Sequence, residues 1–343
     1  MKAIVIHAPN DLRYEQVADQ PLGRDDVRVK IEVGGICGSD LHYYRHGGFG
    51  TVKIRHPMIL GHEIAGVVTE TGQDVASLRI GQRVTVNPSL SCGVCAFCWK
   101  GLRNQCLDMR FYGSAMRFPH VQGAFRELLV CEESQAHVVA DGVSLGEAAM
   151  AEPLAVCLHA ARRAGPLLGK KVLITGSGPI GALCVIAARR AGAVEIFVTD
   201  VADGALNFAR EVGADATFNV AAQPDALVPF SADKGAFDVM FEASGAEAAL
   251  RGGLDVVRPG GVIVQLGLGD EKKLPVNAIV AKEIELRGTF RFHEEFGLAV
   301  TLMGKGLVDV KPLISATLPF ANPTEAFELA MDRNRSMKVQ LAF

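Results

Sequence analysis

Three residues of the sequence have the types that hold a zinc ion in a catalytic site. Cys37 lies in a glycine-rich stretch, and His62 directly precedes a second acid, Glu63. The third residue, Glu152, stands in an otherwise apolar run. Three protein ligands leave the fourth position of a tetrahedral zinc open for a substrate. Each residue also has an ordinary interpretation, as a small core hydrophobe, a satisfied core histidine or a helix-end charge, so the assignment depends on the rest of the chain.

A second set of possible metal ligands is formed by cysteines alone. Cys92, Cys95, Cys98 and Cys106 follow the spacing C-x2-C-x2-C-x7-C. Turns of this length can wrap four thiolates around one tetrahedral ion, and such a site has no open position. We therefore predict a structural zinc ion that stabilises a lobe and does not catalyse. The competing interpretations are an iron–sulfur cluster and a chance cluster of core thiols.

A glycine-rich loop in the middle of the chain has the spacing of a dinucleotide-binding turn. A short apolar strand over residues 170–175 runs into G-x-G-x-x-G, and a helix-forming stretch over residues 182–191 follows. The first glycine permits a tight turn, the second lets the backbone approach a pyrophosphate, and the third lets the helix lie close on the strand. The residues expected to bind the cofactor here are Gly176, Gly178, Pro179, Ile180 and Gly181.

The next predicted strand, over residues 195–199, ends on Asp200. An acid at about this offset from the glycine loop accepts hydrogen bonds from the adenosine ribose hydroxyls. Because a carboxylate repels a 2′-phosphate, we predict NAD as the preferred cofactor, with NADP as the alternative. An acid that caps the following helix is the other interpretation of Asp200.

The elements that must position these residues divide the chain into two kinds of segment. Strand-like runs at residues 2–6, 27–33 and 63–70 are separated by Gly, Pro and Asp, which predicts a small barrel whose loops carry function. From about residue 149 strands and helices alternate, which predicts a doubly wound parallel α/β sheet with helices on both faces.

After residue 308 the sequence returns to strand-like and loop segments, and residues 338–341 are expected to rejoin the first lobe. We accordingly predict a catalytic domain over residues 1–149 and 293–343, and a cofactor domain over residues 150–292. A dinucleotide lies across the carboxyl ends of such parallel strands. The strand-end residues expected to line it, with ordinary turn chemistry as the alternative, are Ser244, Leu266, Gly267 and Phe290.

Composition excludes several classes of protein. The 343 residues are 49% hydrophobic and 21% charged, with a formal net charge of −3 and dispersed basic residues. These values predict a globular protein of two domains, and they favour neither nucleic acid nor membrane as a partner. The first residues have too short an apolar core for a signal peptide, so we expect a cytoplasmic protein.

Five motifs occur in chain order: residues 34–42, residues 61–63, the four cysteines, residues 151–153 and residues 176–181. Together they resemble the zinc-containing medium-chain alcohol dehydrogenases, and the likeness covers essentially the whole chain. A Glu at position 152, where other members carry a second Cys, resembles the polyol dehydrogenase branch. Residues 37–44, 108–121 and 288–292 resemble the L-idonate 5-dehydrogenases more closely still.

The resemblance implies a Rossmann cofactor domain, a GroES-like catalytic domain and two zinc ions per chain. It implies catalytic zinc on Cys37, His62 and Glu152, with Glu63 as a direct or water-mediated ligand. The expected reaction is oxidation of a secondary alcohol of a sugar acid, L-idonate to 5-keto-D-gluconate, with a sorbitol- or xylitol-type polyol as the alternative substrate. The resemblance also implies a homodimer or homotetramer.

Further residues are candidates for proton transfer and substrate binding. Ser39 and His42 follow Cys37 closely, so a hydroxyl-to-imidazole relay through the cofactor ribose is plausible, with local loop hydrogen bonding as the alternative. A carboxylate substrate calls for a guanidinium, which grips it in a bidentate manner. The substrate-binding candidates in the segments that carry the resemblance are Tyr43, Arg110, Arg117 and Arg291.

Two other classes remain as alternatives at this point. A binding protein of the same fold that has lost catalysis would not need both metal sets and the phosphate loop. A zinc-free quinone-reductase-like enzyme would share the glycine loop but lack Cys37, His62 and the four cysteines.

Overall fold

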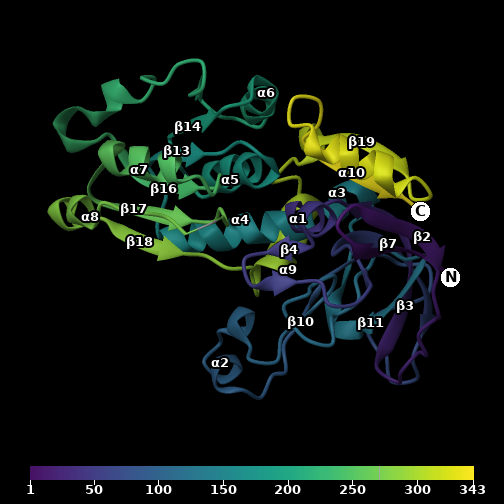
Figure 1. The fold of residues 1–343 in the computed structure, drawn as a ribbon. Helices are drawn as coiled ribbons and strands as arrows, with labels where there is room; N and C mark the ends of the chain where they lie inside the picture. Colours follow the sequence, from purple (N-terminus) through teal and green to yellow (C-terminus); the bar gives the residue numbers. More distant parts are fainter. Residues whose placement is uncertain (270) are drawn as a thin grey trace.

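The computed structural model describes residues 1–269 and 271–343, and it has two main β-sheets that lie at opposite ends of the molecule (Figure 1). The first is a seven-stranded sheet of order β12-β8-β7-β3-β20-β19, with β11 paired to β3. Its strands are β3 (Asp26–Gly35), β7 (Glu63–Thr71), β8 (Arg83–Val86), β11 (Leu128–Glu132), β12 (Ala136–Val138), β19 (Ile314–Pro319) and β20 (Lys338–Ala342). The C-terminal strand β20 runs antiparallel to β3, which confirms that the tail rejoins the first lobe.

Smaller elements surround this sheet. The short strands are β1 (Lys2–Ala8), β2 (Asp11–Gln16), β4 (Gly48–Phe49), β5 (Val52–Lys53), β6 (Met58–Ile59), β9 (Ser89–Leu90) and β10 (Arg110–Phe111). The helical elements are α1 (Gly38–His46), α2 (Ala96–Trp99), η1 (Arg103–Gln105), η2 (Glu133–Gln135), α3 (Leu145–Ala149), η4 (Lys311–Leu313) and α10 (Pro323–Met331). The helix α2 and the turn η1 belong to the four-cysteine lobe, which projects from the catalytic part of the molecule (Figure 1).

The second sheet is parallel and has the order β15-β14-β13-β16-β17-β18. Its strands are β13 (Lys171–Thr175), β14 (Glu195–Asp200), β15 (Ala216–Asn219), β16 (Phe237–Glu242), β17 (Val257–Gln265) and β18 (Glu285–Gly288). The helices that connect or flank them are α4 (Ala151–Ala164), α5 (Pro179–Arg190), α6 (Asp203–Glu211), η3 (Val228–Lys234), α7 (Glu247–Val256), α8 (Val276–Lys282) and α9 (Glu295–Gly304). This topology confirms the predicted α/β fold with a doubly wound cofactor domain.

Alternation along the strands explains why helices cover both faces of the parallel sheet. In β16, Val239 and Phe241 pack in one apolar cluster with residues of α4, α5 and α6. The intervening Met240 packs in a second cluster with Leu250 and Leu254 of α7. Because successive side chains of a strand point to opposite faces, a continuous apolar run signals a strand that is buried on both sides.

The glycine loop between β13 and α5 has the backbone that the motif predicts. Gly176 adopts a left-handed φ of 86°, which an L side chain rarely adopts. A Cβ on Gly181 would lie 1.8 Å from the carbonyl oxygen of Gly176, so the third glycine permits the close approach of helix and strand. Helix α5 begins at Pro179, whose fixed φ and missing N–H suit the first position of a helix.

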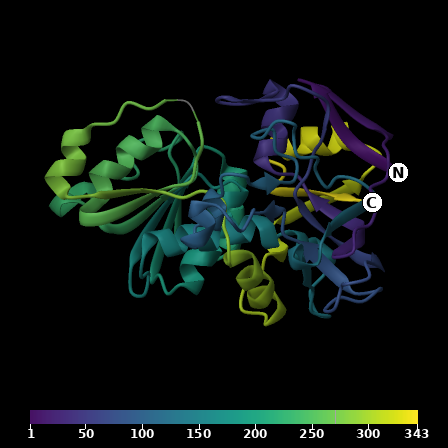
Figure 2. The same ribbon diagram turned by 90° about the horizontal axis from the view of Figure 1, so that it is seen from below.

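One helix differs from the sequence prediction, and the predicted domain boundaries are not tested by the structure. The sequence analysis missed helix α10 and expected only strands and loops there. Its buried residues Pro323, Ala326 and Phe327 span a single helical turn, which gives a weak helical pattern. The predicted domain boundaries at 149/150 and 292/293 stay a prediction. Helix α4 belongs to the predicted cofactor domain and α9 to the predicted catalytic domain, yet the two helices pack in one apolar cluster, so the core does not mark the boundaries (Figure 2). Over residues 1–269 and 271–343, no helix combines the length and apolar character needed to span a membrane.

Candidate active site

The structure brings three of the predicted zinc residues together at the end of the seven-stranded sheet. One ligand atom each from Cys37, His62 and Glu63 lies within 4.8 Å of the others. Cys37 is the N-cap of α1, and Glu63 opens β7 opposite Gly35 of β3. A Cβ on Gly35 would lie 2.2 Å from a Glu63 carboxylate oxygen, so glycine at this position leaves room for the carboxylate.

Glu63 forms a buried ion pair that the sequence analysis missed. The ammonium of Lys338, on β20, donates to both carboxylate oxygens of Glu63 at 2.8 Å and to the carbonyl of Ile36 at 3.1 Å. All three donors of the ammonium are therefore used. Lys338 is 2% exposed, and a lysine is almost never this buried unless it is paired. In the sequence it looked like the polar first residue of a terminal strand.

Asp40 is a second residue whose role the sequence analysis missed, although it lies inside the first motif. Its carboxylate accepts hydrogen bonds from the backbone N–H of Cys37 at 3.0 Å and of Gly61 at 3.2 Å. It also lies 3.8 Å from Nδ1 of His62, a buried atom with no hydrogen bond among the described residues. A histidine that ligates zinc usually has a carboxylate at its other ring nitrogen, and Asp40 is placed for that contact.

Glu152, at the start of α4, is buried near the three-residue cluster but is not one of its members. Burial raises the pKa of Glu152 to about 8; nearby His62 lowers it and Glu63 raises it. Burial also raises the pKa of the Cys37 thiol to about 12, with a further contribution from Glu63. A divalent cation would offset this concentration of buried acids and deprotonate the thiol, so the donor set fits zinc.

The four cysteines of the lobe lie close together as free thiols. Their sulfur atoms all fall within 4.8 Å of one another, with Sγ–Sγ distances of 3.4 Å for Cys92 and Cys106 and 3.5 Å for Cys95 and Cys98. A tetrahedral zinc with Zn–S bonds of about 2.3 Å needs sulfur atoms about 3.8 Å apart. The pKa of Cys95 is lowered to about 6, chiefly by the backbone N–H of Leu107, which favours the thiolate. The residues fit a structural zinc.

Three candidates for proton transfer or substrate binding lie on α1 and differ in burial: Ser39, His42 and Tyr43. Tyr43 is fully buried, and its hydroxyl accepts a hydrogen bond from the N–H of Ala115 at 2.9 Å. Ser39 is half-buried and His42 is exposed. Neither Ser39 nor His42 has a side-chain hydrogen bond within the described part of the chain, so the relay remains a prediction.

The three candidate substrate-binding arginines differ in their contacts. Arg110 is exposed and lies 3.7 Å from Glu132, and Arg117 pairs with Asp108 at 2.6 Å. Arg291 lies instead against aromatic rings, with its guanidinium carbon 4.2 Å from the ring centre of Phe111.

Burial lowers the pKa of Arg291 to about 10, while Glu152 and Tyr43 raise it. Because the ring of Phe111 also lies 5.4 Å from the ring of His62, Arg291 is one residue away from the candidate zinc site.

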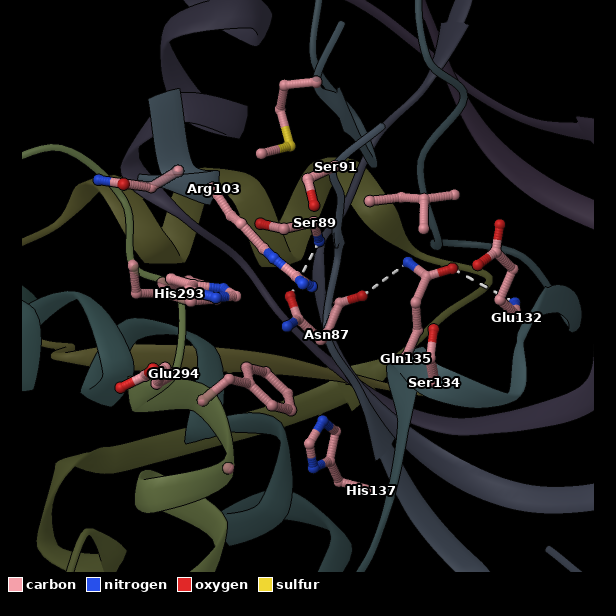
Figure 3. Close-up of a pocket in the computed structure, with 16 residues that line it drawn as sticks. Asn87, Ser89, Ser91, Arg103, Glu132, Ser134, Gln135, His137, His293 and Glu294 are labelled. Carbon is pink, nitrogen blue, oxygen red and sulfur yellow. Dashed lines mark hydrogen bonds between the residues drawn. The ribbon is translucent and has the colours of Figure 1, made fainter. Parts of the chain in front are cut away.

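A cavity of about 420 Å³ lies between the lobe and the segment after β18, and Arg117, Arg291, Phe111, Ser114, Met116 and Phe290 are among its lining residues. The ring of Phe111 is also 5.4 Å from the ring of His62, so the cavity adjoins the candidate metal residues. A second cavity, of about 380 Å³, shares the lobe residues Asn104 and Met109 with the first. Figure 3 shows this second cavity. It is polar, and Asn87, Ser89, Arg103, Gln135 and His293 line it.

At the glycine loop, Gly178, Pro179 and Ile180 are half-exposed, whereas Gly176 and Gly181 are buried. This arrangement leaves the helix N-terminus of α5 open to a phosphate.

Asp200 ends β14 and is 6% exposed. Its Oδ2 accepts from Ser177 N–H at 2.6 Å, and its Oδ1 accepts from Val201 N–H at 2.7 Å and Ala202 N–H at 3.0 Å. The two interpretations of Asp200 are therefore compatible, because a carboxylate has lone pairs beyond these three bonds.

The strand-end residues are held by Glu242, which the sequence analysis placed only in a strand. Its buried carboxylate accepts hydrogen bonds from the N–H of Ser244 at 2.8 Å and of Gly245 at 3.0 Å, and from the Ser244 hydroxyl. Its backbone carbonyl accepts the N–H groups of Leu266 and Gly267, both at 2.8 Å. Two of the predicted cofactor-lining turns are thus fixed to one residue.

Family comparison agrees with this combination of fold and site. Residues 23–141 match the alcohol dehydrogenase GroES-like domain, and residues 179–305 match the zinc-binding dehydrogenase domain. The chain belongs to the zinc-binding alcohol dehydrogenase family of medium-chain dehydrogenases. It is a zinc- and NAD(P)-dependent oxidoreductase.

Individual relatives lie in the predicted branch. L-Idonate 5-dehydrogenase (NAD(P)(+)) of Escherichia coli is 46% identical over 316 residues, which cover 92% of this chain and 91% of that protein. Sorbitol dehydrogenase of Bacillus subtilis is 35% identical over 347 residues, 99% of this chain and 97% of that protein. The crystal structure of L-idonate 5-dehydrogenase from Escherichia coli superposes with a TM-score of 0.95 at 43% identity, covering 100% of this chain and 98% of that one.

We predict that the two zinc sites respond differently to loss of a ligand. Cys95→Ser should lower the thermal unfolding temperature or soluble yield, because a structural zinc contributes folding free energy. Cys37→Ser should abolish turnover and leave the fold intact. Metal analysis should find two zinc ions in the wild type and one in each variant. One ion or none in the wild type, or a Cys95→Ser variant of unchanged stability, would contradict the assignment.

We also predict that Lys338→Met lowers the free energy of unfolding by about 3–5 kcal/mol, because it leaves the Glu63 carboxylate buried without its partner. Adding Glu63→Gln should recover part of the loss, since the uncompensated charge is then removed. The control is Lys311→Met, which removes an exposed lysine 3.6 Å from Glu147 and should cost about 1 kcal/mol at most. Chemical denaturation measures all three, and equal effects of the two lysine changes would refute the assignment.

Proposed function

We propose that this enzyme oxidises a secondary hydroxyl of an anionic sugar acid, L-idonate to 5-keto-D-gluconate, with NAD as the preferred electron acceptor. The observation that supports it best is the position of Arg291. Its partly desolvated guanidinium lines the cavity that adjoins His62 through Phe111, and it forms no ion pair with any carboxylate among the described residues. The 46% identity to L-idonate 5-dehydrogenase supports the same substrate class.

Cys37, His62 and Glu152 are the residues that would hold the catalytic zinc, with Glu63 as a direct or water-mediated ligand. A zinc ion held there would supply a Lewis acid that lowers the pKa of the substrate hydroxyl, and a bound NAD would supply the hydride acceptor. Asp40, 3.8 Å from Nδ1 of His62, would orient this ring, and Lys338 holds both carboxylate oxygens of Glu63 at 2.8 Å. The rings of Phe111 and Phe290 and the sulfur of Met116 contact the guanidinium of Arg291 and leave its N–H donors free of a carboxylate partner among the described residues, so they can bind the carboxylate of a substrate.

The proton released from the hydroxyl needs a route to solvent. Ser39 and His42 lie on the same helix three residues apart, which places them on one face of α1. Although the residue as a whole is exposed, partial desolvation of its ring and nearby His46 lower the pKa of His42, so the neutral imidazole can accept a proton at neutral pH. Its exposed position allows it to pass the proton to water.

We further propose that the protein is a cytoplasmic homodimer or homotetramer. Strand β18 is the edge of the parallel sheet, and Leu286 on it is 41% exposed. Val276 and Val280 on neighbouring α8 are also exposed. An uncovered edge with apolar side chains is a surface that a second copy of the chain can pair with.

The substrate prediction is tested by charge. L-Idonate should be a much better substrate than the neutral polyols sorbitol and xylitol, and Arg291→Ala should cost about 1.5–3 kcal/mol in kcat/KM for the acid. The same change should cost little for the polyols. Arg110→Ala, at an exposed arginine that lines neither cavity, serves as the control and should change kcat/KM little. Equal efficiency on acids and polyols would assign the enzyme to the sorbitol and xylitol dehydrogenases.

The cofactor prediction concerns Asp200. Asp200→Ser should weaken NAD use and raise the ratio of NADP to NAD efficiency, because it removes a ribose acceptor and a charge opposed to the 2′-phosphate. Asp203→Ser, an exposed acid three residues later on α6, is the matched control and should leave the ratio as it is. Steady-state kinetics with both cofactors gives the ratio, and an unchanged value for Asp200→Ser would remove this residue from the cofactor site.

A further inference from the structure

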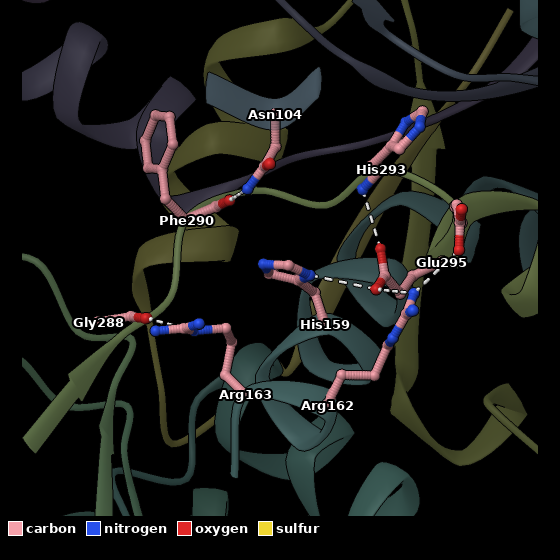
Figure 4. Close-up of polar contacts among 9 residues, drawn as sticks. Asn104, His159, Arg162, Arg163, Gly288, Phe290, His293 and Glu295 are labelled. Carbon is pink, nitrogen blue, oxygen red and sulfur yellow. Dashed lines mark hydrogen bonds and ion pairs between the residues drawn. The ribbon is translucent and has the colours of Figure 1, made fainter. Parts of the chain in front are cut away.

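One hydrogen bond links the four-cysteine lobe to the segment that carries Arg291. Asn104 lies in η1, two residues before the last cysteine of the lobe, and is 9% exposed. Its side-chain Nδ2 donates to the backbone carbonyl of Phe290 at 2.9 Å (Figure 4). Because the neighbouring thiols would be fixed by a bound zinc, the lobe offers a rigid anchor for this contact.

The segment that receives this bond is held at its two ends by other contacts. Arg163 donates from Nε to the carbonyl of Gly288 at 3.1 Å, and Thr289 N–H donates to Gln265 at 3.2 Å. At the far end, His293 N–H donates to the carboxylate of Glu295 at 2.9 Å (Figure 4).

Between these ends the backbone has little support. In the part of the chain that the structure describes, the carbonyl of Phe290 is the only backbone group of Phe290, Arg291 and Phe292 with a hydrogen bond. Asn104 therefore holds the middle of the segment.

Arg291 needs such support because its backbone is strained. It has a left-handed φ of 54°, which costs conformational energy for a residue other than glycine. Strained residues persist when their surroundings hold them, and they cluster at functional sites. Its guanidinium contacts are weak ones, with the rings of Phe111 and Phe290 and, at 3.2 Å, with the sulfur of Met116.

The position of Asn104 also fits a role in the cavity wall. Asn104 lines both cavities beside the lobe. Phe290 and Arg291 line the cavity near the candidate zinc residues, and Phe292 and His293 line the second cavity. Figure 3 shows His293 there. A shift of the segment at Phe290 would therefore move Arg291 relative to a bound substrate.

We propose that Asn104 is a positioning residue for substrate recognition, through which the four-cysteine lobe fixes the place of Arg291. The lobe then serves the selection of an anionic substrate as well as the stability of the fold. This proposal rests on the role of Arg291 given under the proposed function.

The test variant is Asn104→Leu, which removes the donor at nearly constant volume and adds no charge beside Arg291. KM for L-idonate should rise about tenfold, because the single hydrogen bond that holds the Phe290 carbonyl is lost. The value of kcat should change less than about threefold. Asn207→Leu, the same change at an exposed asparagine of α6, is the control and should match the wild type. Zinc content and thermal unfolding of each variant show whether the lobe is intact.

A double-mutant cycle tests whether Asn104 acts through Arg291. In an Arg291→Ala background, Asn104→Leu should raise KM no further, because the group that it positions is gone. An equal fold-change in both backgrounds, or a loss of zinc and unfolding temperature that accounts for the kinetic change, would show a merely structural role and overturn the proposal.

A third measurement needs neither cofactor nor substrate. The rate at which 2,3-butanedione modifies Arg291, followed by peptide mass spectrometry, should rise several-fold in Asn104→Leu, with exposed Arg162 as the internal reference. An unchanged rate together with an unchanged KM overturns the proposal. If the wild type does not oxidise L-idonate, the proposed function fails, and the modification rate alone decides whether Asn104 positions Arg291.

Discussion

The buried ion pair of Lys338 and Glu63 is the interaction on which the catalytic part of the molecule depends. It joins residues 275 positions apart and is closed to solvent, so neither charge can be relieved by water if the other is lost. Its geometry requires β20 to lie beside β3, which ties the C-terminal strand to the sheet that carries Cys37 and His62. The last few residues of the chain therefore help to build the active site.

The same pair shapes the electrostatics of the candidate metal site. Lys338 supplies one positive charge to a region that also contains the buried acids Glu63, Glu152 and Asp40 and the thiol of Cys37. One ammonium does not balance them, and the pKa values of Glu152 and Cys37 are raised in consequence of their burial. Such a site favours a divalent cation for a reason independent of sequence motifs, because the cation makes the charged forms of all its ligands compatible.

The sequence predicted those features whose residues all lie within one short stretch of the chain, and it missed those that depend on contacts between distant segments. The four-cysteine set and the glycine loop are each contained in a short stretch, so spacing alone predicted their chemistry and the structure brings their atoms together. Lys338 acts across strands that are distant in sequence, whereas Glu242 joins the turn that follows it to the turn after β17, and no local pattern marks either residue. Helix α10 was missed for a related reason, since its weak apolar pattern becomes helical only against the sheet that buries Phe327.

The three candidate arginines illustrate the same limit, and they bear on where substrate selection is proposed to lie. Sequence alone offered Arg110, Arg117 and Arg291 and favoured Arg291, because it follows a strand of the cofactor sheet. In the structure the first two have carboxylate partners, Glu132 and Asp108. Arg291 lies where the chain passes from the edge of the cofactor sheet back to the catalytic domain, so its position depends on both. A contact from the metal-binding lobe at Asn104 then connects three parts of the molecule at one side chain. Substrate recognition placed there is sensitive to how the domains sit together, which neither domain determines alone.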